Sequence, residues 1–382
     1  MRIRMNERIA TRSVFFIAGL ATSAWAVMVP FAKLNTGANE ALLGILLLCL
    51  GGGAIISMPL AGPLSSRYGC RKIIGYAVMI IILSMPFLTL ANSPVTLGFL
   101  LLIFGIGVGL TDCAMNIQAI LVEKNAGTPL MSGFHGMYSV GGIAGAGLMT
   151  GLLTFGLNIL ASSLVVSLII FMLLMVCFSR LLPYASPAEG PAFAFPKGEV
   201  LLFGAICFIV FLAEGTVLDW SAVYLVEVRQ IADSQAGLGF TFFALAMTVG
   251  RLSGDVIIRR FGSLHIVVSG AVLAFGGFCL IIFSTSLIAL LIGYLCIGAG
   301  CANIVPVMFS QIGKQTSMPQ MVAVPAVTTM GYIGVLAGPA MIGFIAHHSS
   351  LPHAFIFVAA LMLIVLMLSV ALNRTIKLHQ EF

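Results

Sequence analysis

Two acidic residues, Asp112 and Glu214, lie inside long apolar stretches of the sequence. Asp112 belongs to the stretch 95–122 and Glu214 to the stretch 200–225, and neither stretch contains a lysine or an arginine. An ionised side chain at the centre of a bilayer costs at least ~2.5–3.5 kcal/mol on insertion scales, and loss of hydration favours the uncharged form of a carboxyl group. We therefore expect at least one of the two to be protonated in some state and to carry a proton. The alternative is a neutral acid that is hydrogen-bonded for structure.

The composition places most of the chain in a membrane. Only 8% of its 382 residues are charged and 60% are hydrophobic, whereas a soluble domain is about 25% charged. We count about twelve apolar runs that could each cross ~30 Å of hydrocarbon as a helix. The approximate spans are 12–33, 40–61, 72–91, 95–122, 131–154, 158–180, 200–225, 237–258, 263–283, 287–311, 321–346 and 353–373. The predicted fold class is an all-α membrane protein with 12 transmembrane helices in two pseudo-symmetric six-helix bundles.

The basic residues gather on one side of this predicted topology. If the N-terminus is cytoplasmic, every lysine and arginine except Lys33 and Arg229 falls on the cytoplasmic side. The positive-inside rule therefore predicts a multi-pass protein of a bacterial inner membrane with both termini in the cytoplasm. The run Ala24-Trp25-Ala26 resembles a signal-peptide cleavage site, but we expect the first span to be retained. The net charge of +6 then indicates contact with anionic membrane lipids rather than with nucleic acid.

Motifs for enzymatic chemistry are absent from the sequence. The eight cysteines form no CxxC pair or metal-like cluster, and no phosphate-binding loop or catalytic triad occurs. We predict neither an enzyme nor a metal or other cofactor, and energy from ATP is not expected.

A polar, proline-rich segment divides the chain at its midpoint. Residues 182–199 contain four prolines and suit an extended linker. The predicted domains are an N-terminal six-helix bundle (1–181), a cytoplasmic central linker (182–199) and a C-terminal six-helix bundle (200–382).

The two halves carry similar short motifs. Arg67-Tyr-Gly corresponds to Arg260-Phe-Gly, and the only two tryptophans, Trp25 and Trp220, fall in the first and seventh spans. The run from Gly107 to Asp112 matches the run from Gly298 to Asn303 at an offset of about 191. These matches place Asp112 opposite Asn303, and the tryptophans place Glu214 opposite Gly19. An internal repeat around a central loop is typical of transporters that bind substrate near the membrane midplane.

The chain resembles the major facilitator superfamily over essentially its whole length. Besides the twelve spans, the loop from Gly62 to Lys72 reads GPLSSRYGCRK, similar to the family signature G-x-L-x-D-R-x-G-R-R/K. Ser66 replaces the acidic residue and Cys70 the first basic one, so the resemblance leaves the cytoplasmic latch of this half in doubt. The resemblance implies alternating access. The gating residues it suggests are Arg67, Arg71, the pair Arg251 and Asp255 at the end of span eight, and His135. A structural role is the alternative for the Arg251–Asp255 pair and for His135.

More narrowly, the runs FGIGVGLTDCAMNIQ, MSGFHGMYSVGG and LAEGTVLDWSAVYL resemble the YbjJ-like branch of bacterial inner-membrane facilitators. This branch is similar, at a distance, to the fucose–galactose–glucose:proton symporters. Asp112 followed by Asn116 matches their acid and asparagine in span four. Their acid in span one has no counterpart here, so the resemblance supports their scheme of proton coupling only in part.

Family architecture implies that spans one, four, seven and ten line a central cavity. The residues that could bind substrate there are polar or aromatic: Trp25, Asn116, Gln118, Tyr138, Asp219, Trp220 and Asn303. Because we expect no lysine or arginine in this cavity to bind an organic anion, the sequence favours a neutral or cationic substrate. Interfacial anchoring and helix–helix hydrogen bonding are the alternatives for the tryptophans and amides.

The predicted function is a monomeric secondary transporter that takes up a small neutral, sugar-like solute together with protons. One alternative is a proton antiporter that exports hydrophobic or cationic compounds. Another is a membrane sensor that has kept the fold and lost transport.

Overall fold

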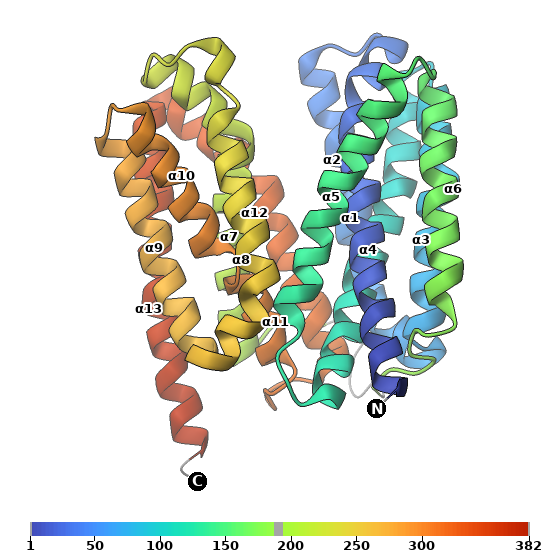
Figure 1. Ribbon diagram of the computed structural model, residues 1–382, viewed down its shortest axis with the longest axis vertical. Coiled ribbons are helices and arrows are strands. Elements are labelled where there is room, and N and C mark those ends of the chain that lie inside the picture. The colour runs from blue at the N-terminus through green and yellow to red at the C-terminus, as the bar shows by residue number, and fades with distance from the viewer. Residues whose placement is uncertain (1, 187–193, 381–382) are drawn as a thin grey trace. The chain divides into compact units, whose positions relative to one another are not determined.

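The computed structural model (Figure 1) describes residues 2–186 and 194–380, except for the side chains at 2–4, 40–41 and 373–380. Within these residues 12 helical segments are long and apolar enough to cross a membrane, and no β-strand occurs. The predicted all-α fold and span count are confirmed. Residues 187–193 of the predicted linker lie outside the described residues.

The helices follow one another through short connections, as Figure 1 shows. Their bounds are α1 (Arg2–Thr36), α2 (Glu40–Tyr68), α3 (Cys70–Leu90), α4 (Pro94–Ala126), α5 (Met131–Thr154), α6 (Ile159–Phe178), α7 (Glu199–Val223), the π-helix η1 (Tyr224–Val228), the 3-10 helix η2 (Asp233–Gln235), α8 (Leu238–Phe261), α9 (Ser263–Phe283), α10 (Leu287–Cys301), α11 (Ile304–Ile312), α12 (Gln320–His348) and α13 (Leu351–Gln380).

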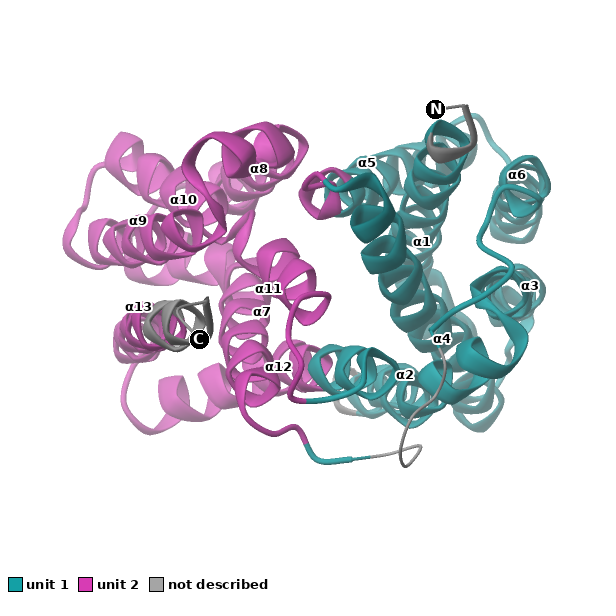
Figure 2. Cartoon of the chain, turned by 90° about the horizontal axis from the view of Figure 1, so that it is seen from below, with its two compact units in different colours: residues 1–127, 134–195, 318–329 teal, residues 128–133, 196–317, 330–382 magenta. Residues whose placement is uncertain are grey.

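The chain forms two compact units, coloured separately in Figure 2. Unit 1 contains Met1–Gly127, Phe134–Phe195 and Met318–Thr329; unit 2 contains Thr128–Gly133, Pro196–Ser317 and Met330–Phe382. The chain passes from one unit to the other between Phe195 and Pro196, inside the predicted linker 182–199. Two short segments differ from the predicted domains. The first residues of α5 group with unit 2, and the start of α12 groups with unit 1.

Each unit packs its helices in the same pattern. In unit 1, α4 packs on α1, α2 and α3, and α6 packs on α1 and α3. In unit 2, the segment α10–α11 packs on α7, α8 and α9, and α13 packs on α7 and α9. This correspondence establishes a structural repeat within the chain.

Close glycine contacts fix the register of the repeat. A Cβ on Gly105 of α4 would lie 2.1 Å from the carbonyl oxygen of Leu50 on α2. A Cβ on Gly298 of α10 would lie 2.2 Å from the carbonyl oxygen of Phe243 on α8. Both the glycines and their partners are 193 residues apart. Small residues allow such close backbone approach between membrane helices.

This register corrects the offset of 191 predicted for spans four and ten. With an offset of 193, Asp112 lies opposite Val305, and Asn303 lies opposite Leu110. The sequence match between Asp112 and Asn303 is wrong because glycines recur every few residues in both spans, and several registers align them.

The same reasoning corrects the alignment of spans one and seven. Gly141 of α5 packs on the backbone of Phe16, and Gly334 of α12 packs on the backbone of Phe208. The two phenylalanines are 192 residues apart.

At that offset Glu214 lies opposite Thr22 rather than Gly19, and Trp25 lies opposite Val217. The two tryptophans are therefore not equivalent in the repeat.

The turns after α2 and α8 also correspond. Gly69 and Gly262, which end these helices, have φ values of 83° and 82°, a conformation that favours glycine. They are 193 residues apart, in agreement with the predicted match of Arg67 to Arg260.

We predict that Gly105→Ala and Gly298→Ala will each destabilise the protein, because the added methyl group would strike backbone carbonyls. Overpacking of this kind costs ~1–3 kcal/mol. Gly276→Ala in α9 is the control, since nothing lies within 4 Å of its Cβ position, and alanine gains ~0.5–1 kcal/mol over glycine within a helix. Thermal unfolding in detergent measures the difference. Equal thermal unfolding midpoints for all three variants would contradict the close helix packing at Gly105 and Gly298.

Candidate functional site

Glu214 forms an ion pair inside unit 2. An η-nitrogen of Arg251 on α8 lies 3.3 Å from each carboxylate oxygen of Glu214 on α7, and the two side chains are only 9% and 18% exposed. The expectation that no base reaches the buried acids is therefore wrong for Glu214.

This pair is not evident from the sequence, because the span that contains Glu214 has no base of its own. Arg251 lies in the neighbouring span and about ten residues, or ~15 Å, from the end of α8, so its predicted place at the helix end is also wrong. The pair offsets the cost of burying either charge alone.

A break in span ten lies beside this ion pair. Helix α10 ends at Cys301 and α11 begins at Ile304. Pro306 has no N–H group, so the carbonyl four residues earlier, that of Ala302, lacks its helical donor. The Nε of Arg251 points at this carbonyl oxygen at 3.4 Å. In the sequence, Pro306 was the signal for this break. The predicted span 287–311 was continuous and did not include the break.

Asn303 attaches the break to α8. Its Nδ2 donates to the carbonyl oxygen of Gly250 at 3.0 Å, and a Cβ on Gly254 would lie 2.0 Å from its Oδ1. Asn303 is 6% exposed. The contacts show Asn303 positioning the helix that carries Arg251, and its predicted role in substrate binding stays a prediction.

Asp112 stands in a different electrostatic setting, on α4 of unit 1. Among the described residues no side chain or backbone group bonds to its carboxylate, and no cation pairs with it. Asn116 is buried and donates its Nδ2 to the backbone oxygen of Asp112 at 2.9 Å. Asp112 is partly exposed.

Two predicted aromatic residues of unit 1 lie on α1 and α5. The Trp25 ring packs against Phe104 of α4 with ring centroids 6.2 Å apart, and Trp25 is 5% exposed. The Tyr138 hydroxyl lies 3.1 Å from the hydroxyl of Thr22, and Tyr138 is partly exposed.

Gln118 is fully buried and holds three segments together. Its Nε2 donates to the Thr11 hydroxyl on α1 at 3.0 Å, and its Oε1 accepts from the N–H of Leu182 at 3.2 Å. These bonds give Gln118 a structural role, and we leave it out of the substrate site.

The remaining predicted residues of unit 2 lie further along α7. Asp219 is exposed, whereas Trp220 is partly buried. The indole N–H of Trp220 is buried without a partner among the described residues, and its ring edge borders Gly343. An unpaired buried donor of this kind is costly, which makes Trp220 the better candidate to meet a ligand.

The predicted gating residues of unit 1 have distinct contacts. Arg67 is exposed and stacks over the Tyr68 ring at 5.3 Å. Arg71 donates to the carbonyl oxygens of Ser179 and Leu181 at 2.8 and 2.9 Å, so it binds the C-terminal end of α6.

Asp255 of α8 contacts the first turn of α5, and His135 lies near the start of α5. An Asp255 oxygen accepts from the N–H of Gly133 at 3.0 Å, a favourable place for a negative charge at a helix N-terminus. His135 is 9% exposed, with its ring 5.2 Å from that of Phe15.

Comparison with known proteins identifies the family. The sequence profile of the Major Facilitator Superfamily matches residues 13–316 and 202–379. An uncharacterized MFS-type transporter of Yersinia pestis is 47% identical over 362 residues, covering 94% of each chain. The chain belongs to the major facilitator superfamily. Membrane protein MosC of Rhizobium meliloti is 31% identical over 369 residues, covering 94% of this chain and 88% of MosC.

Solved structures of this superfamily share the fold at low sequence identity. The proton:xylose symporter XylE matches with a TM-score of 0.78 at 13% identity, covering 96% of this chain and 95% of XylE. The E. coli fucose:proton symporter FucP matches with a TM-score of 0.78 at 16% identity, covering 95% and 97%. A bacterial homologue of the iron transporter ferroportin matches with a TM-score of 0.75 at 13% identity, covering 98% and 100%. The chain is thus a multi-pass membrane protein of a transporter family.

We predict that Arg251→Met and Glu214→Gln will each destabilise the protein by ~3–5 kcal/mol, because each leaves a buried partner uncompensated. The double variant should lose much less stability than the sum of the losses in the two single variants. Arg259→Met is the control, since Arg259 is exposed on the same helix and such changes usually stay within ~0.5 kcal/mol. Thermal unfolding of all four variants gives the coupling energy, and additive losses would show that the pair does not interact.

Proposed function

We propose that this protein is a proton-coupled secondary transporter that takes up a small neutral, sugar-like solute across a bacterial inner membrane, with both termini in the cytoplasm. The observation that carries the proposal is the different setting of the two buried acids. Glu214 has a cation, Arg251, at 3.3 Å. Asp112 has no cation partner among the described residues, so only a proton can neutralise its charge and only water can hydrate it.

Asp112 is accordingly the proton carrier in this proposal. With a proton bound, the side chain is neutral and α4 can turn toward the apolar layer at low cost. When water reaches the carboxyl from the side of lower proton concentration, the proton leaves. The membrane potential supplies ~2.3 kcal/mol per charge per 100 mV for this transfer.

The Glu214–Arg251 pair supplies a polar surface with no net charge. Arg251 lies among the spans, so the absence of a basic residue cannot by itself exclude an anionic substrate. Because Glu214 neutralises Arg251, the site still offers no net positive charge to an anion. In unit 1 the Tyr138 hydroxyl, and in unit 2 the Trp220 indole N–H, are each a candidate to bind a neutral solute.

The likeness to the fucose and xylose symporters supports proton symport at the level of the fold. The similar fit to a ferroportin homologue means that the fold alone does not select the cargo. The internal repeat supports alternating access, since transporters with repeats rock one half against the other.

Asp255 is our candidate gating residue. It lies one turn beyond Arg251 on α8 and holds the first turn of α5 by its bond to Gly133. Loss of that bond would free the start of α5.

The direct test is proton flux in liposomes that contain the purified protein. A panel of neutral monosaccharides and hydrophobic cations is added outside, and a pH dye reports proton movement. We expect one of the neutral sugars to drive protons inward with the wild type. Asp112→Asn should abolish proton movement while still exchanging labelled solute, because asparagine cannot release a proton.

Asp233→Asn is the matched control, since it removes an exposed acid outside the proposed sites and should couple normally. Normal coupling by Asp112→Asn would contradict the role of Asp112. Outward proton movement driven by a cation would favour the antiporter, and no movement of any solute would favour a sensor.

A further inference from the structure

A surface groove lies on unit 1 between α2, α3 and α4. It has a volume of about 440 Å³ and is lined by Leu64, Tyr68, Lys72, Ile73, Tyr76 and Leu110. This volume falls in the range of ~300–1,000 Å³ that is usual for small-molecule sites. Leu110 and Asp112 are two residues apart on α4, so their side chains point to nearly opposite sides of the helix. The groove is therefore separate from the proposed proton site.

The polar groups of the groove have no hydrogen-bond partner in the part of the chain that the structure describes. Among the described residues nothing bonds to the hydroxyls of Tyr68 and Tyr76 or to the ammonium of Lys72. The guanidinium of Arg67 lies 5.3 Å from the centre of the Tyr68 ring and adds a second positive charge beside the groove. These groups offer two cations and two hydroxyl donors to a ligand.

The groove faces basic side chains, and the helix stretches that line it carry no acidic residue. No aspartate or glutamate occurs between Glu40 and Asp112, so α2 beyond its first residue, α3 and the first half of α4 carry no acidic side chain. A ligand with a phosphate group and no cation of its own complements this surface.

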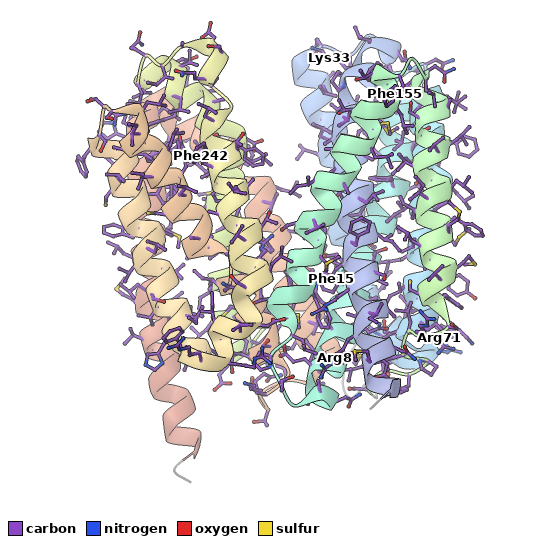
Figure 3. All side chains as sticks on the ribbon, viewed as in Figure 1. Arg8, Phe15, Lys33, Arg71, Phe155 and Phe242 are labelled. Atoms are coloured by element: carbon purple, nitrogen blue, oxygen red, sulfur yellow. The ribbon has the colours of Figure 1, made fainter. Side chains whose placement is uncertain are left out.

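The position of the groove matches the depth of lipid headgroups. Lys72 follows Arg71, which lies at the same end of unit 1 as Arg8, whereas Lys33 lies at the other end (Figure 3). Tyr76 lies one turn, ~5.4 Å, further into span three. Tyrosine and lysine favour the membrane interface, and the apolar side chains suit acyl carbons.

We infer that this groove binds one anionic phospholipid, with its phosphate against Lys72 and the tyrosine hydroxyls and the start of an acyl chain against Leu64, Ile73 and Leu110. A zwitterionic lipid fits less well, because its headgroup cation would meet Lys72 and Arg67. Attraction of each basic residue to an anionic lipid is commonly worth about a fivefold change in affinity.

Native mass spectrometry of the purified protein tests this inference. Phosphatidylglycerol and phosphatidylcholine are titrated separately in detergent. We expect tighter binding of phosphatidylglycerol by the wild type, and an affinity for it about fivefold weaker in Lys72→Gln. The conservative variant Tyr68→Phe/Tyr76→Phe should also bind it more weakly. Lys124→Gln is the control, because it removes an exposed lysine of unit 1 outside the groove.

Equal affinity for the two lipids would overturn the inference, as would equal losses in Lys72→Gln and Lys124→Gln. Glycerol phosphate, which has the headgroup chemistry without acyl chains, should not displace the lipid. If glycerol phosphate displaces it at equal concentration, the groove binds a soluble phosphate compound instead.

Discussion

Neutralisation of buried carboxyl groups is the constraint on which the rest of this structure depends. An apolar layer tolerates a carboxylate only when a cation, a proton or water removes its cost. Glu214 has Arg251, and Arg251 is itself held by the carbonyl that the helix break at Ala302 leaves free. Asp112 has neither cation nor hydrogen bond within the described chain. The first acid therefore has a cation beside it, and the second has none among the described residues.

A symmetric scaffold carries these asymmetric charges. The glycine contacts superpose α4 on α10–α11 and α2 on α8 with one register. In that register Arg251 lies opposite Met58, and Asp112 lies opposite Val305. Each unit thus places ionisable groups where the other has apolar residues. Because the backbone packing is equivalent, the two units differ in chemistry rather than in architecture.

The sequence predicted the twelve spans and the positions of both acids within them, because hydropathy and charge are properties of the individual residues. It did not predict the partner of Glu214, since contacts between spans depend on helix rotation, which a single sequence does not determine. The repeat register failed for a related reason, as glycines at several spacings align equally well. The break in span ten was predictable from Pro306. The structural role of Gln118 was not predictable, because its partners, Thr11 and Leu182, are far from it in the sequence.

Infrared spectroscopy of the protonated carboxyl band tests the central claim most directly. In purified protein at neutral pH, exposed acids are ionised and do not contribute to this band. The account predicts a band in the wild type that disappears in Asp112→Asn and persists in Glu214→Gln. A band that persists in Asp112→Asn and disappears in Glu214→Gln would show that Glu214 holds the proton and would contradict the assignment.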